Sequence, residues 1–285
     1  MTGAAIEKID SAHLRQWIGH EETVSDVITA DLVRKFCATF DMQRPTSQIG
    51  ERAPSLVHFC VAQPSAPTAQ LGDDGHPRRG GFLPPVPLPR RMWAGSHVVF
   101  HRGLHIGDIV RRVSRIADVT LKQGHTGILC FVTVEHVIEV DGRTVLAEIQ
   151  DIVYRAFDGG QQKKPAEPAK AGSWQQRVVT PSPFLFRYSA LTFNGHRIHY
   201  DRRYAVEVEH YPGLVVHGPL QATLLVNYAE ELRGGPPSSF RFRSLSPLFD
   251  NDTVVLHAEE EGKKLKLWTA REGGPVAMTA EADWN

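Results

Sequence analysis

Residues 217–232 read HGPLQATLLVNYAEEL, a long and largely apolar stretch that predicts the main helix of the second half of the chain. Four stretches of strand character follow it, at residues 240–245, 252–260, 264–272 and 275–283. The segments EEEGKK and EGGP join three of these strands as turns. A helix followed by an antiparallel sheet is therefore expected here.

The segments before this stretch extend the same pattern. Residues 180–192 (TPSPFLFRYSALT) predict a helix capped by Ser182, with Pro183 in its first turn. In the first half, residues 29–41 (TADLVRKFCATFD) predict a helix capped by Thr29. Strands rich in Val and Ile are predicted after it, at residues 107–119, 126–140 and 144–154. A helix laid against a bent antiparallel sheet, made twice, predicts an α+β protein of two similar modules.

Two segments lack the composition of regular structure. Residues 63–91 contain GDDGHPRRGGFLPPVPLPRR, and their Gly and Pro content predicts a long surface loop or covering flap. Residues 158–173 (DGGQQKKPAEPAKAGS) are polar and read as a linker. The predicted modules are therefore residues 1–157 and 174–285.

Composition limits the partners. Lys+Arg and Asp+Glu are equal at 32 each, with no run of like charge, so nucleic acid and an anionic membrane are not expected as partners. A small molecule is expected instead. The first ten residues lack the features of a signal peptide, and Cys37, Cys60 and Cys130 are odd in number and widely spaced. A cytoplasmic protein is the expectation, and a homo-oligomer is compatible with it.

Residues 193–201, FNGHRIHYD, carry the densest chemistry. His196 and His199 are three positions apart, whereas zinc-binding histidines on a helix are four apart, and no clear third ligand follows. No metal and no other cofactor are therefore expected. From composition alone, a polar turn formed by Asn194 and Gly195 is an equally valid interpretation.

A resemblance favours the chemical interpretation. RYSALTFNGHRIHYDRRYA (residues 187–205) and HGPLQ (217–221) resemble the MaoC-like hydratase/dehydratase family, whose motif runs Gly-Asp-x-Asn-Pro-Ile-His-x-Asp. LPRRMWAGS (residues 88–96) is similar to the degenerate first half of its mitochondrial-type dehydratase and itaconyl-CoA hydratase subgroup. The resemblance implies a double hot-dog fold, with a degenerate first module and a catalytic second module.

The same resemblance assigns residue roles. The catalytic histidine falls on His199, and the catalytic aspartate of the family falls on Asn194, which is a departure from the motif. Gly218 would offer its N–H to the thioester carbonyl, and His217, the residue before it, would contact the substrate. His196 stands where the motif has asparagine and Arg197 where it has proline, while Ile198 and Asp201 match.

Addition of water to an enoyl thioester needs a base, a donor to the enolate oxygen and a proton for the α carbon. His199 can act as the base, and the N–H of Gly218 at a helix N-terminus suits the oxygen. Asn194 would position the water through its carbonyl oxygen. Asp201 would either orient the imidazole or cap the next turn.

The expected substrate is an acyl-CoA thioester, with mesaconyl-C4-CoA or itaconyl-CoA hydrated to citramalyl-CoA. A free carboxylate would need an arginine. Arg91 and Arg197 are preferred over Arg90 and Arg187, and Trp93 is expected to line the acyl tunnel. The first half is expected to bring no acid/base group, since residues 29–54 contain no histidine.

Three other functions remain open. They are a 3-hydroxyacyl-thioester dehydratase, a non-catalytic acyl-thioester binding subunit and a hot-dog thioesterase. The thioesterase would need a carboxylate on the central helix, where Glu230 and Glu231 lie too near the end.

Overall fold

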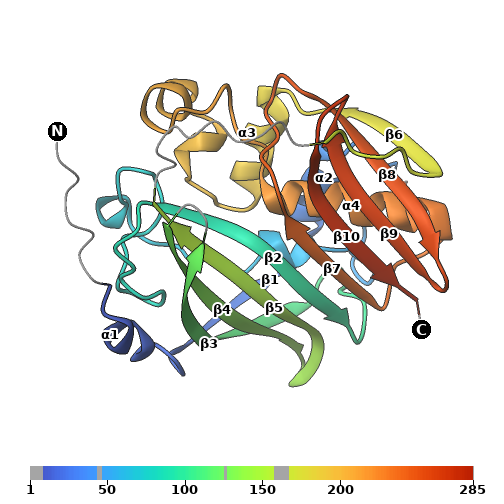
Figure 1. Cartoon of the computed structure of the whole chain (residues 1–285). Coiled ribbons are helices and arrows are strands. Elements are labelled where there is room, and N and C mark those ends of the chain that lie inside the picture. Colours follow the sequence, from blue (N-terminus) through green and yellow to red (C-terminus); the bar gives the residue numbers. More distant parts are fainter. Residues whose placement is uncertain (1–8, 44–46, 125–126, 157–166, 285) are drawn as a thin grey trace.

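The computed structural model describes residues 9–43, 47–124, 127–156 and 167–284. Within them, ten antiparallel strands form one sheet in the order β1-β3-β4-β5-β2-β7-β10-β9-β8-β6 (Figure 1). The first half contributes β1 (Glu21–Val27), β2 (Arg90–Phe100), β3 (Ile109–Gly124), β4 (Gly127–Val140) and β5 (Arg143–Arg155). The second half contributes β6 (Trp174–Val179), β7 (Ser239–Ser244), β8 (Thr253–Glu261), β9 (Lys264–Arg271) and β10 (Val276–Asp283).

The helices lie mainly in the second half. They are α1 (Ser11–Arg15), α2 (Ala30–Thr39), α3 (Ser182–Leu191) and α4 (Gly218–Arg233). Shorter turns occupy Val57–Cys60, Thr68–Gln70 and Arg197–His199 as 3₁₀ helix, and Tyr204–Val208 as π helix. None of these helices is both long and apolar enough to cross a membrane.

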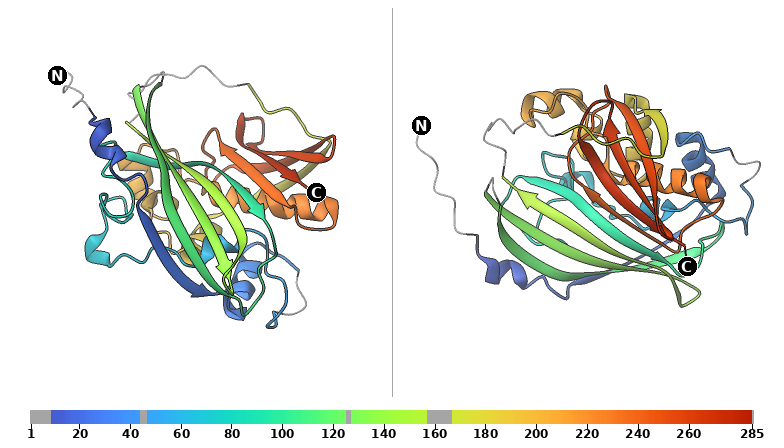
Figure 2. Two further views of the ribbon diagram at one scale, coloured as in Figure 1. Left: turned by 90° about the horizontal axis from the view of Figure 1, so that it is seen from below. Right: turned by 45° about the vertical axis from the view of Figure 1, so that its right-hand side comes forward.

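The two halves share one sheet because β2 pairs with β7 (Figure 2). Gly95 allows this contact: a Cβ atom at this position would lie 2.4 Å from the carbonyl oxygen of Phe242. A bulge between Trp93 and Gly95 bends β2 where the halves meet. The second half therefore does not form a separate body.

The core also joins the halves. α4 packs across the strands of the second half and against β2, and its buried face includes Leu220, Leu225 and Val226. α2 packs against α3, where the ring of Phe40 contacts those of Phe184 and Tyr188. A smaller cluster, with Ile116, Val132 and Tyr154 among its members, lies under the long loop of the first half.

The sequence predicted most of these elements and the α+β class. It missed β1, β2 and β6. β1 and β6 lie at the edges of the sheet and contain no buried residue, so they lack the pattern of a half-buried strand. The predicted loop 63–91 is too long by two residues, since Arg90 and Arg91 begin β2. Ser182 does not cap α3: the N-cap is Pro181 and Ser182 is the first helical residue.

The predicted linker, residues 158–173, lies mostly outside the described residues. Its described end contacts the second sheet half, where the N–H of Ala169 donates to the carbonyl of Gly274. The N–H of Gly172 donates to Nδ1 of His257. The module boundaries stay a prediction.

Candidate active site

His199 ends the 3₁₀ turn after α3 and is buried. Its Nδ1 lies 2.7 Å from the carbonyl oxygen of Val215, so Nδ1–H donates and Nε2 keeps its lone pair. Burial lowers the pKa of His199 to about 4, although the bond to Val215 acts in the opposite direction. At neutral pH His199 is therefore a neutral imidazole with an oriented, unprotonated Nε2.

His217 fixes the position of this ring. The two imidazoles stack with their centroids 3.6 Å apart, and Nε2 of His217 lies 2.8 Å from Oγ of Ser189 on α3. Burial, followed by the nearby His199, holds the pKa of His217 well below its usual value. His217 is completely buried, so its role as a direct substrate contact is less well supported than a role in supporting His199.

Gly218 follows His217 as the first residue of α4. Among the described residues its N–H has no hydrogen-bond partner, as expected for the first turn of a helix. The helix dipole adds partial positive charge at this end. An oxygen that gains negative charge would be stabilised at this N–H, one residue from the imidazole that stacks on His199.

The other motif residues form the turn. The Oδ1 atom of Asn194 accepts the N–H of His196 at 2.9 Å, so this carbonyl oxygen is engaged in the turn and not free to hold water alone. Asp201 accepts the N–H of Tyr204 and pairs with Arg197 at 2.7 Å. Of the two alternatives for Asp201, the cap is the one that the contacts support.

Arg197 is bound on several sides. Besides Asp201, its guanidinium donates to the carbonyl of Asp73 at 3.0 Å and lies 4.2 Å over the ring of Tyr204. Its charge is therefore already matched within the turn. Trp93 donates its indole N–H to Oγ of Ser96 at 2.8 Å and packs against the ring of Phe59, as a core residue does.

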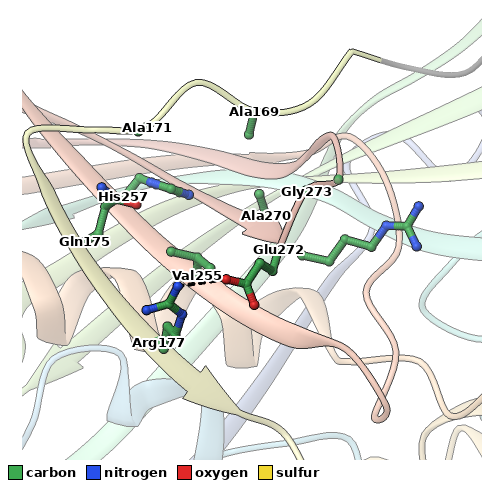
Figure 3. A pocket seen from close by; sticks show the side chains of 11 residues that line it. Ala169, Ala171, Gln175, Arg177, Val255, His257, Ala270, Glu272 and Gly273 are labelled. Carbon is green, nitrogen blue, oxygen red and sulfur yellow. Dashed lines mark hydrogen bonds and ion pairs between the residues drawn. The ribbon is translucent and has the colours of Figure 1, made fainter.

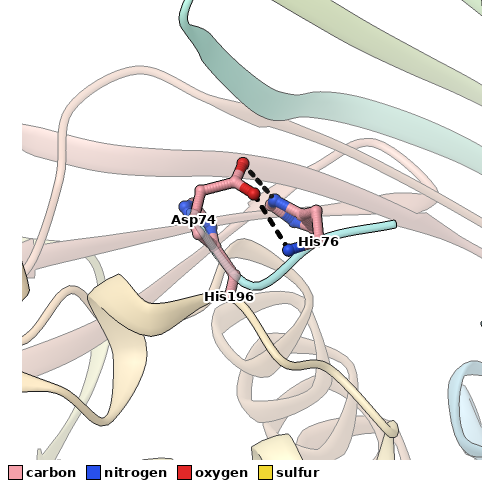
Figure 4. Close-up of side chains that lie close together, drawn as sticks. All are labelled: Asp74, His76 and His196. Carbon is pink, nitrogen blue, oxygen red and sulfur yellow. Dashed lines mark hydrogen bonds and ion pairs between the residues drawn. The ribbon is translucent and has the colours of Figure 1, made fainter. Parts of the chain in front are cut away.

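A second ionisable pair comes from the first half. Asp74 and His76, in the loop GDDGHP, lie beside His196, with the rings of His76 and His196 4.1 Å apart (Figure 4). Asp74 accepts both the backbone N–H and the Nδ1–H of His76, at 3.0 and 2.9 Å. The structure thus differs from the expectation that the first half brings no acid/base group.

Two glycines allow this contact. A Cβ atom on Gly75 would lie 1.9 Å from the carbonyl oxygen of Gly195, so the GDDGHP loop and the NGHR turn touch through bare backbone. The N–H of Arg197 donates to the carbonyl of Asp74 at 2.9 Å. The repeated Gly-His pairs, 75–76 and 195–196, are the sequence signal that could have indicated the contact.

The charges around the pair come from both halves. Burial would raise the pKa of Asp74, but the bond and charge of His76 lower it to about 2. Burial, followed by the charge of Arg91, lowers the pKa of His76 to about 4. Burial, followed by His76, holds the pKa of His196 well below its usual value. At neutral pH Asp74 is ionised and both imidazoles are neutral.

Asp74, His76 and His196 have ligand atoms within 4.8 Å of one another, a spacing that a metal ion could bridge. Asp74, however, already binds His76 through both oxygens, and the charge of Arg91 acts on all three side chains and opposes a cation. An anionic group is therefore the better ligand here.

A surface pocket of about 330 Å³ lies elsewhere, between β6, β8, β9 and residues 169–171 (Figure 3). Of its charged residues, Arg177 and Glu272 pair at 2.7 Å, and Arg271 adds one more positive charge. None of its lining residues belongs to the histidine site.

Comparisons with solved structures agree with this architecture. A MaoC-like dehydratase from Phytophthora capsici superposes with a TM-score of 0.74 at 15% identity, covering 97% of this chain and 98% of its own. A Mycobacterium tuberculosis protein with a double hotdog fold gives a TM-score of 0.54 at 13% identity, covering 93% of this chain and 95% of its own. The chain therefore has the double hot-dog fold.

Comparisons of the sequence identify the family of this chain. The family model described as hydroxyacyl-thioester dehydratase type 2 matches residues 56–250, and the chain belongs to this family. The mesaconyl-C(4)-CoA hydratase of Chloroflexus aurantiacus is 42% identical over 277 residues, which cover 96% of this chain and 99% of that protein.

Proposed function

We propose that this protein is a hydro-lyase that adds water reversibly to an enoyl-CoA, with mesaconyl-C4-CoA, a 2-enoyl-CoA, or itaconyl-CoA as substrate and citramalyl-CoA as product. The observation that carries the proposal is that two groups occur in one site. They are the oriented, unprotonated Nε2 of His199 and, among the described residues, the unpartnered N–H of Gly218, the residue after the stacked His217. The 42% identity to a mesaconyl-C(4)-CoA hydratase supports the choice of substrate.

In the proposed reaction with mesaconyl-C4-CoA, whose double bond is conjugated to the thioester, Nε2 of His199 removes a proton from water as the oxygen bonds to the β carbon. The electron pair of the double bond moves toward the thioester, and the N–H of Gly218 binds the enolate oxygen. The imidazolium of His199 then returns the proton to the α carbon. Asn194 has a supporting role, because it shapes the turn from which His199 projects.

The experiment is a panel of thioesters followed at the ultraviolet band of the enoyl thioester. For itaconyl-CoA, whose double bond is not conjugated to the thioester, citramalyl-CoA is measured by chromatography instead. Mesaconyl-C4-CoA and itaconyl-CoA should be hydrated faster than crotonyl-CoA, and citramalyl-CoA should be the product. Release of free CoA would identify a thioesterase instead, and binding without turnover would identify a non-catalytic subunit. The structure does not favour the thioesterase, since Glu230 and Glu231 lie in the last turn of α4.

A 3-hydroxyacyl-thioester dehydratase is the second candidate, because the family description names that activity. Faster turnover of an unbranched 3-hydroxyacyl thioester than of citramalyl-CoA would favour it. Arg91 is the proposed contact for a free carboxylate of the substrate. We also propose that the protein is cytoplasmic and forms a homo-oligomer.

A further inference from the structure

Four ionisable side chains next to His199 have no task in the reaction described above. They are Asp74 and His76 from the GDDGHP loop, Arg91 from β2 and His196 from the NGHR turn. We call this group the Arg91 corner. It draws residues from both halves of the chain. The rings of His76 and His196 lie 4.1 Å apart, and Nδ1 of His76 lies 2.9 Å from the carboxylate of Asp74.

The acyl group of the proposed substrate carries one free carboxylate. In mesaconyl-C4-CoA the free carboxylate is borne by the same β carbon that receives the hydroxyl, so it must lie close to the base. The ring of His196 lies 5.3 Å from that of His199, and the ring of His76 lies 4.1 Å beyond it. A carboxylate on the reacting carbon therefore comes within reach of these imidazoles.

Arg91 lies on β2, opposite Tyr154 of β5, and is the cation that we assign to such a group. Its charge acts on Asp74, His76, His196 and Tyr154. Arg197 is held by Asp201 and by the carbonyl of Asp73, so it is not the equivalent alternative that the sequence had indicated.

We propose that the Arg91 corner binds the free carboxylate of a dicarboxylyl thioester, and that His76, held by Asp74, takes up one proton when the carboxylate binds. This inference rests on the proposed hydratase function and specifies its substrate subsite. It assigns the first half a binding task in addition to shaping the pocket.

The proton uptake follows from the charges that face His76. Arg91 and Arg79 disfavour the imidazolium, Asp74 favours it, and His196 packs against the ring as a neutral group. A bound carboxylate would offset the charge of Arg91 and add a second negative charge. The protonated His76 would then donate one N–H to Asp74 and the other to the ligand.

The test uses two saturated thioesters that cannot be hydrated or dehydrated. They are 2-methylsuccinyl-CoA, with CoA at C4, and 3-methylbutyryl-CoA, which has a methyl group where the first has the carboxylate. Calorimetric titration of the full chain at pH 6, in two buffers of different ionisation enthalpy, gives the affinity and the number of protons taken up. We expect uptake of about one proton with the dicarboxylyl ligand, and none with the other.

The variants separate the two parts of the proposal. Arg91→Gln should reduce the preference for 2-methylsuccinyl-CoA by about 10–100-fold, the range for losing a charged hydrogen bond, and Arg91→Lys should retain part of it. His76→Gln should abolish the proton uptake while leaving most of the affinity for 3-methylbutyryl-CoA. Arg203→Gln is the matched control, because Arg203 is exposed and paired with Glu207.

Equal affinity of the wild type for the two thioesters would overturn the carboxylate subsite. Unchanged proton uptake in His76→Gln would overturn the role of His76, and binding that is lost with a chelator and restored by Zn²⁺ would replace the subsite with a metal site. Binding is measured without turnover, so a wild type that discriminates the ligands but hydrates no enoyl-CoA would refute the proposed function alone.

Discussion

His199 and Asn194 belong to one turn but contribute different chemistry. Nε2 of His199 is the atom that can exchange a proton, whereas Oδ1 of Asn194 accepts the N–H of His196 and gives the turn its shape. Because Asn194 stands where the motif has aspartate, Asp201 is the only carboxylate of residues 193–201, and it pairs with Arg197. The protonation of His199 is then governed by burial.

The first prediction compares the two side chains. His199→Ala should lower kcat/KM by about 10²–10⁴-fold, the usual range for the loss of a positioned acid/base. Asn194→Ala should cost less, because it removes support without removing the proton acceptor. Steady-state kinetics with mesaconyl-C4-CoA measure both, and circular dichroism checks folding. A small loss in His199→Ala would mean that another residue is the base.

The second prediction concerns pH. Because the pKa of His199 is lowered to about 4, its basic form persists down to that pH, and kcat/KM should fall only below about pH 5. In Asn194→Asp the turn can still form, but the new carboxylate favours the imidazolium and should move this limb to higher pH. Asn194→Gln is the uncharged control, and a limb that does not move in Asn194→Asp would contradict the assignment.

At the scale of elements, the important contact is backbone against backbone. The GDDGHP loop reaches the NGHR turn because Gly75 and Gly195 carry no side chain. Gly75 also has a φ of +85°, a conformation that residues with a side chain rarely adopt. The position of His76 and Asp74 therefore depends on this residue.

The third prediction tests that dependence. Gly75→Ala should displace the loop and raise KM for dicarboxylyl substrates more than for crotonyl-CoA, because the Arg91 corner would lose Asp74 and His76 while His199 stays in place. Gly80→Ala is the control, since Gly80 has a φ of +90° in the same loop but no atom closer than 3.7 Å to an added Cβ. Equal effects of the two variants on both substrates would contradict the prediction.

At the scale of the molecule, the pairing of β2 with β7 makes the two halves one sheet. β2 also carries Arg91 and packs against α4, whose N-terminus holds Gly218. Removal of the first half would expose β7 as an edge strand and take away the Arg91 corner. The first half thus contributes residues to the candidate site of the second half.

The fourth prediction follows. Residues 172–285 expressed alone should lose most of the hydratase activity and associate or aggregate through the exposed β7. Co-expression with residues 1–157, which restores the β2–β7 pair, should recover activity. Size-exclusion chromatography and the thioester assay measure both. Full turnover by the isolated second half would show that the first half is dispensable.

The sequence by itself determined the α+β class, the helices α3 and α4, the strands β7 to β10 and the FNGHRIHYD turn, because local periodicity and a continuous motif depend only on neighbouring residues. It also placed Gly218 at the start of α4. It did not reveal β2, nor β1 and β6, which contain no buried residue.

Only the tertiary structure decided which residues meet at the site. Asp74 and His76 lie about 120 positions before His196, and no local pattern reports a contact made through the backbones of Gly75 and Gly195. In the same way, Arg91 and Arg197 are equivalent in sequence. The structure distinguishes the two arginines. Asp201 neutralises Arg197 within its own turn, whereas Arg91 lies on β2 and its charge acts on His76.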